Sequence, residues 1–175
     1  MFGPLIAASA IGGVTAITLG FVLCLSGARF NTTSSIPLGL YWISSAPMEK
    51  GAYVMVCPPN TSVFEEAEKR GYIAAGFCAG HYGYIFKRVL AVGGDVIAIT
   101  NEGVRINGQL LPLSAPRKVD GGGRPMPGYQ PNPFTLTASE VLLMSDASSL
   151  SFDGRYFGPL NRAQIRSLIR PIWTW

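Results

Sequence analysis

The segment that decides the fold reads Tyr84-Ile85-Phe86-Lys87-Arg88-Val89-Leu90. Aromatic and branched residues dominate residues 83–91, which predicts a β-strand. Side chains alternate across a strand, so Ile85, Lys87 and Val89 share one face and Arg88 lies on the other. One basic side chain therefore lies on an apolar face, whichever face is buried. A buried lysine is desolvated, which lowers its pKa toward the range of a general base. The alternative is a surface lysine that buries only its stem.

Segments on both sides of this strand favour a mostly antiparallel β domain. The dipeptide Asn107-Gly108 separates two short apolar runs, and Asn-Gly supplies the positive φ angles of a type I′ hairpin turn. One short helix is predicted at residues 63–70, because Ser62 and Glu65 form a capping-box pattern and Gly71 favours a helix end. Further strands are predicted at residues 40–44, 52–56, 96–100 and 140–144.

Two segments nearer the C-terminus are less regular. Residues 112–133 are rich in proline and surround the run Gly121-Gly122-Gly123, which predicts an irregular, mobile excursion. Residues 165–175 are apolar but contain Pro171, which lacks a backbone donor. We therefore expect an edge strand or a partly packed extension at the tail.

The chain begins with an apolar run. No charged side chain occurs from Phe2 to Ala28, and the first charge is Arg29. The run exceeds the roughly 20 residues that cross a bilayer, which predicts a transmembrane helix within residues 1–29. A cleaved signal sequence is the alternative, because Ser26-Gly27-Ala28 fits a small-x-small cleavage site. The run is, however, longer than the roughly 7–15 apolar residues of a typical signal. Residues 30–175 would then form one domain.

Charge and cysteine content narrow the function classes. The net charge of +4 is spread along the chain without an aromatic-interleaved basic stripe, which argues against nucleic-acid binding. One histidine and no Cys-x-x-Cys argue against a zinc site, and no cofactor is expected. Cys24 lies in the apolar run, whereas Cys57 and Cys78 lie in the polar part. An exported domain would permit a disulfide between the last two, and two unpaired thiols are the alternative.

Two further segments carry candidate catalytic side chains. Ser35 precedes Pro37 in a polar loop, where a fixed φ angle helps to hold a serine hydroxyl in place. Ser151, Asp153 and Arg155 occupy alternate positions of a second segment. There an ion pair can pin a loop while the serine bonds a lysine amine. A serine nucleophile with a lysine base is a known arrangement for acyl transfer. Each segment taken alone also fits an ordinary polar loop.

The ordered combination resembles the type I signal peptidase superfamily, the serine–lysine membrane peptidases. In that family a nucleophile segment is followed by Tyr-x-x-Lys-Arg-Val with Gly-Asp, then by Ser-x-Asp-x-Arg-x-Phe-Gly. The matching residues here are 84–89 with Gly94-Asp95, and 151–158. Ser145-Asp146 departs from the Gly-Asp of the family at a position without a catalytic group. The resemblance covers most of residues 30–175 and implies a curved antiparallel β-fold with one N-terminal membrane helix and one short helix.

Within the superfamily, the sequence most resembles the conjugative-transfer branch called TraF, whose members mature a pilin. Ser35 and Pro37 have the Ser-x-Pro spacing of that branch. The Cys57 and Cys78 pair also resembles the branch, which implies a disulfide. Ser34 has the Ser-x-x-Pro spacing of ordinary signal peptidases and is the alternative nucleophile.

The resemblance implies a role for each motif residue. Ser35 is the expected nucleophile and Lys87 the expected general base. The Ser35 amide and the Thr33 hydroxyl are expected to form an oxyanion hole, which stabilises the charge of the transition state. The expected supporting residues are Ser151, which orients the lysine, and the pair Asp153 and Arg155.

The implied protein is a peptidase of the bacterial inner membrane with its catalytic domain, residues 30–175, in the periplasm. Its expected substrate is an exported pilin precursor, and the acyl-enzyme ends in hydrolysis or in cyclisation of the product. Two alternatives remain open: a general signal peptidase that removes signal peptides, and a non-catalytic component of a conjugation or secretion channel. If the N-terminal run is cleaved, the domain is soluble in the periplasm.

Overall fold

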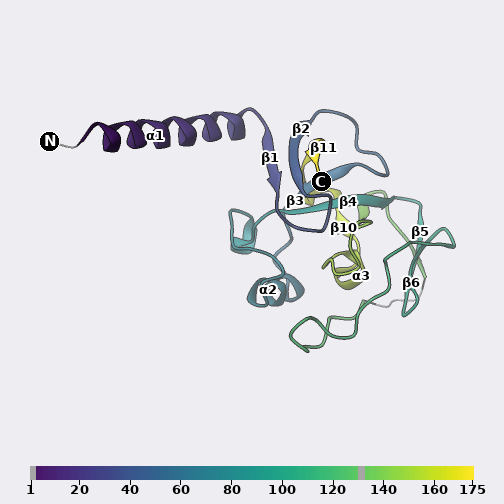
Figure 1. The fold of residues 1–175 in the computed structure, drawn as a ribbon. Helices are drawn as coiled ribbons and strands as arrows, with labels where there is room; N and C mark the ends of the chain where they lie inside the picture. Colours follow the sequence, from purple (N-terminus) through teal and green to yellow (C-terminus); the bar gives the residue numbers. More distant parts are fainter. Residues whose placement is uncertain (1–2, 130–132) are drawn as a thin grey trace.

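The computed structural model describes residues 3–129 and 133–175 of the chain. Its first element is α1 (Pro4–Leu25), which stands clear of the rest of the molecule in Figure 1. The stretch Ala8–Leu25 has a mean hydropathy of 2.0, and none of it is buried. By length and composition this helix is able to cross a membrane, and both a membrane anchor and a signal sequence fit it.

The rest of the chain is mostly β, as predicted. Within the described residues, seven antiparallel strands form a curled sheet in the order β1-β2-β11-β3-β4-β9-β10, and four form a second sheet in the order β7-β6-β5-β8. The larger sheet contains β1 (Ala28–Asn31), β2 (Gly39–Ser44), β3 (Tyr53–Val56), β4 (Ile85–Val92), β9 (Glu140–Met144), β10 (Leu160–Asn161) and β11 (Ile165–Thr174). The smaller sheet contains β5 (Val96–Thr100), β6 (Gly103–Ile106), β7 (Gln109–Leu110) and β8 (Phe134–Thr135).

The C-terminal strand β11 corrects one prediction. It lies between β2 and β3 inside the larger sheet, so the expectation of an edge strand is wrong. Pro171 is tolerated because the pairing with β3 ends at Ile169, so beyond that residue β11 pairs with β2 alone. A register shift follows between Pro171 and Trp173. The proline thus lies on a part of the strand that needs hydrogen bonds on a single side.

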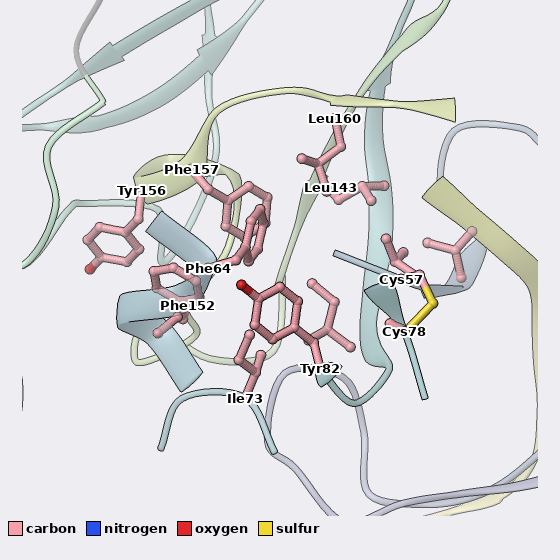
Figure 2. Packing of buried hydrophobic residues seen from close by; sticks show 14 of the residues in the cluster. Cys57, Phe64, Ile73, Cys78, Tyr82, Leu143, Phe152, Tyr156, Phe157 and Leu160 are labelled. Carbon is pink, nitrogen blue, oxygen red and sulfur yellow. A yellow bond between two sulfur atoms is a disulfide. The ribbon is translucent and has the colours of Figure 1, made fainter. Parts of the chain in front are cut away.

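The main core fills the space between the larger sheet and two short helices, α2 (Ser62–Lys69) and α3 (Gly154–Phe157). Figure 2 shows Phe64 of α2 packed beside Phe152 and Phe157. The ring centroids of Phe64 and Phe157 lie 4.9 Å apart. The N-cap of α2 is Thr61, with no side-chain cap bond, so the predicted capping box at Ser62 does not form.

A disulfide closes the loop that contains α2. Cys57 and Cys78 are bonded, with 5.4 Å between their Cα atoms, and both lie in the main core (Figure 2). In the chain-entropy model, a crosslink over about 20 residues stabilises the fold by roughly 3 kcal/mol. Cys24, on α1, is free and exposed.

The irregular course predicted for residues 112–133 is confirmed over their described part, whereas their mobility stays a prediction. An isolated bridge pairs Val119 with Pro125, and strand β8 begins directly after the segment. Residues 130–132 lie outside the described residues.

Candidate active site

The candidate base stands on β4, an interior strand of the larger sheet. Burial alternates along β4, and Lys87 lies on the buried face with only 3% of its surface exposed. Its Nζ donates to the Ser35 Oγ at 2.8 Å and to the Ser151 Oγ at 2.9 Å. Burial lowers the pKa of Lys87 from 10.5 to about 8; Asp153 opposes this shift and Arg155 adds to it. A substantial fraction of this amine is therefore neutral near pH 8.

The candidate nucleophile lies in the loop between β1 and β2. We call residues 32–38 the nucleophile loop. Ile36 is fully buried and anchors the loop to the domain, and the Tyr41 hydroxyl donates to the Pro37 carbonyl at 2.7 Å. Ser35 is partly exposed, so its hydroxyl touches both the buried lysine and open space. The Ser35 amide donates no hydrogen bond to any described residue, so it is available to an oxyanion.

Asn31 holds the nucleophile loop in shape, and the sequence analysis did not single it out. The residue ends β1 and is 3% exposed. Its side-chain amide donates to the carbonyls of Thr33, Ile36 and Pro37 at 2.8 to 3.0 Å. Its Oδ1 accepts from the Thr33 amide at 3.1 Å. An asparagine that opens a polar loop often bonds the backbone two residues ahead, and that tendency was the available signal.

Thr33, the expected partner in the oxyanion hole, is exposed. Its Oγ1 donates to the Asn31 Oδ1 at 3.0 Å. To donate to an oxyanion, the hydroxyl has to rotate away from Asn31. The catalytic role of Thr33 therefore stays a prediction that requires this rotation.

The expected supporting residues meet beneath Lys87. Asp153 and Arg155 are 0% and 1% exposed and form a two-pronged ion pair, with N–O distances of 2.8 and 3.0 Å. Asp153 also accepts from the Ser145 amide at 3.1 Å, and Arg155 donates to the Leu113 carbonyl at 2.7 Å. The pair thus ties the end of β9 to residues 113–115 and satisfies two buried charges.

The third motif is partly helical. Residues 154–157 form the helical turn α3, so alternate positions of the motif do not share one face as they would along a strand. Asp153 is the N-cap of this turn and accepts from the Arg155 amide at 3.2 Å. This cap turns the chain so that the Arg155 side chain returns to the Asp153 carboxylate. Ser151, 4% exposed, remains directed at Lys87 and lies 3.3 Å from the Ser35 Oγ.

Two hollows open beside Ser35. The first, of about 230 Å³, is lined by parts of β1, residues 72–74 and residues 84–87. The second, of about 340 Å³, is lined by the nucleophile loop, residues 150–152 and part of the proline-rich excursion. Thr33, Ser35, Tyr72 and Phe152 line both. Beside the first hollow, Ile85–Lys87 pairs with β3 on one side only, because the pairing with β9 begins at Arg88.

The chemistry of this arrangement is polar and acid–base. Among the described residues, no three His, Cys, Asp or Glu side chains gather as a metal site. A buried amine bonded to a serine hydroxyl suits proton abstraction from that serine. Open space on both sides of the hydroxyl suits an extended chain that crosses it.

Comparison with a family model and with curated proteins identifies the family of the chain. The family model described as signal peptidase, peptidase S26, matches residues 5–175. A plasmid transfer protein TraF from Escherichia coli is 62% identical over 94% of this chain and 93% of its own length. A conjugal transfer protein TraF from Agrobacterium tumefaciens (strain 15955) is 36% identical over 93% of this chain and 90% of its own. A solved signal peptidase I from Enterococcus faecalis V583 shares 14% identity over 73% of this chain, with a TM-score of 0.40.

Proposed function

The chain belongs to the signal peptidase family, peptidase S26, and from this premise we propose that it cleaves peptide bonds with Ser35 as nucleophile and Lys87 as general base. The observation that carries the proposal is the 2.8 Å contact between the Lys87 Nζ and the Ser35 Oγ. The amine is buried, and its pKa is lowered to about 8, so it can accept the serine proton near neutral pH.

The proposed reaction has two stages. The neutral amine of Lys87 takes the Ser35 proton as the Oγ attacks the substrate carbonyl. The Ser35 amide and the Thr33 hydroxyl donate to the oxyanion, and the Lys87 ammonium then protonates the departing amine. An ester on Ser35 remains, and water or a second amine attacks it while Lys87 again removes a proton. Ser151 keeps the amine aimed at Ser35 throughout.

We propose an exported pilin precursor of a conjugative plasmid as the substrate. Support comes from relatives named plasmid transfer and conjugal transfer proteins, which match most of the chain. We place α1 in the bacterial inner membrane and residues 30–175 in the periplasm, where a disulfide such as Cys57–Cys78 persists.

We also propose that the acyl-enzyme ends in cyclisation of the product. Residues 117, 119–121 and 126 belong to the lining of the second hollow. A substrate segment that fills the hollow against them limits the access of water to the ester. An amine held there gains from its high effective concentration.

The experiment uses the full chain in proteoliposomes with the pilin precursor encoded on the same plasmid. Intact mass and N-terminal sequencing of the product distinguish the outcomes. A product lighter than the linear chain by one water, without a free N-terminus, supports cyclisation. A linear product with a free N-terminus limits the activity to hydrolysis. Processing that persists in Ser35→Ala contradicts the proposed nucleophile.

A further inference from the structure

The second hollow has a fixed wall, formed by residues 117–126, which we call the wall segment. The Asp120 carboxylate is its hub. It accepts from the Tyr72 hydroxyl at 2.5 Å, from the Arg124 Nε at 2.6 Å and from two amides of the wall segment at 2.8 Å. The Arg70 side chain also donates to the Pro125 carbonyl at 2.6 Å. These bonds fasten the wall segment to α2 and Tyr72 without any bound chain.

The wall segment and the candidate nucleophile line the same hollow. Its lining includes Ser34, Ser35 and Ser151 together with Arg117, Val119 and Asp120. Phe152 and Tyr156 add apolar and aromatic surface. The Tyr156 hydroxyl accepts from the Arg117 amide at 3.0 Å, which places the start of the wall segment over α3. A polypeptide that crosses Ser35 therefore places residues near its scissile bond in this hollow.

The charge of the wall segment is unbalanced. It contains Arg117, Lys118 and Arg124 but one acid, Asp120. The hydrogen bond from Tyr72 and those from Arg124 hold the pKa of Asp120 well below its usual range, so this carboxylate is ionised and already bonded. Arg117 is exposed, and its side chain forms no ion pair with any described residue. The hollow that contains the candidate nucleophile is thus lined by one arginine whose charge is not paired within the described residues.

We propose that this hollow is a substrate subsite that selects an acidic side chain close to the scissile bond, with Arg117 as its recognition group. A guanidinium binds a carboxylate through parallel hydrogen bonds, which an amide of the same shape cannot match. Asp120 repels the acidic substrate side chain only weakly, because the ion pair with Arg124 neutralises its charge. The inference rests on the proposed peptidase function and adds the chemical class of residue that the enzyme prefers.

The test uses the full chain in detergent micelles and a defined mixture of synthetic peptides, with cleavage sites read by mass spectrometry. Each cleaved peptide is remade as a matched set with Glu, Gln or Lys at each of the three positions on either side of the bond. We expect kcat/KM to favour Glu over Gln by about 5-fold at one of these positions, the upper range for a partly exposed ion pair. In Arg117→Gln that ratio falls to near one, and in Arg117→Glu the Lys peptide becomes the preferred substrate.

Lys118→Gln is the matched control, because Lys118 is the adjacent cation and does not line the hollow. It should keep the Glu preference of the wild type. Cleavage without any Glu preference, or a preference that survives in Arg117→Glu, overturns the subsite and leaves the peptidase function standing. If no peptide is cleaved and the pilin precursor also remains intact, the proposed function fails and the subsite fails with it.

Discussion

The proposed base and the proposed nucleophile are held by opposite means. Lys87 lies on an interior strand, where the sheet fixes its backbone and burial sets its pKa. Ser35 lies in a partly exposed loop, whose shape depends on one buried amide, that of Asn31. The contrast teaches that the pKa of the base depends on the fold, whereas the aim of the nucleophile depends on a few local hydrogen bonds. Substitutions at Lys87 and substitutions in the nucleophile loop should therefore impair activity in different ways.

The largest expected effect is loss of the nucleophile. Ser35→Ala should lower kcat/KM on the pilin precursor by about 10³-fold or more, because the hydroxyl that forms the ester is gone. Ser34→Ala should keep most of the activity, since the Lys87 contact is made by Ser35. Single-turnover assays of both variants measure this. Loss of activity in Ser34→Ala with full activity in Ser35→Ala would move the nucleophile by one residue.

The next effect concerns the base. Lys87→Arg should be almost as inactive as Lys87→Ala, because arginine stays protonated and cannot accept a proton. In the wild type, the pKa of about 8 means that Lys87 is mostly protonated at lower pH. The rate should therefore climb about tenfold per pH unit below pH 8 and level off above it. A pH-independent rate, or an active arginine variant, would disprove the role of the lysine.

A smaller effect is expected at Asn31, on the nucleophile side. Asn31→Leu keeps the approximate size of the side chain and adds no charge, but it loses the donors to three carbonyls. We expect kcat to fall by about 10- to 100-fold, because small misplacement of a reacting group is costly. The midpoint of the pH–rate profile should stay near 8, since β4 is untouched. A changed KM with an unchanged kcat would argue against a positioning role. Thr32→Ala, an exposed neighbour, is the control.

The same contrast explains what the sequence could predict. Because a strand has one simple period, alternation along residues 85–89 predicted that one basic side chain, Lys87 or Arg88, lies on an apolar face. The structure decides between them and buries Lys87. The helical turn at residues 154–157 was missed because four residues are too few to show a helical period. The interior place of β11 was missed because it depends on pairing with strands far away in the chain. The Asn31 hydrogen bonds were missed for the opposite reason: they are local, but polar loops have no period. Cys57 and Cys78 were paired through the family resemblance, and the disulfide is present.

The smallest expected effect is on stability. It tests the burial of Lys87 separately from the position of Ser35. The ordinary pKa of lysine is 10.5, and burial lowers that of Lys87 to about 8. Between these values the unfolded chain binds more protons than the folded one, so the free energy of unfolding rises with pH across that window. Below pH 8 the lysine is charged in both states, so the whole cost of burying the charged amine is present, roughly 3 kcal/mol at about 1.4 kcal/mol per pH unit.

Lys87→Met removes this cost together with two hydrogen bonds to serines. The variant should therefore be inactive but more stable than the wild type at pH 6, with an advantage that shrinks as the pH rises from about 8 to 10.5. Urea unfolding of both proteins across this range measures the difference. A difference that is constant with pH would show that burial does not shift this lysine, and the base would then need another source of its low pKa.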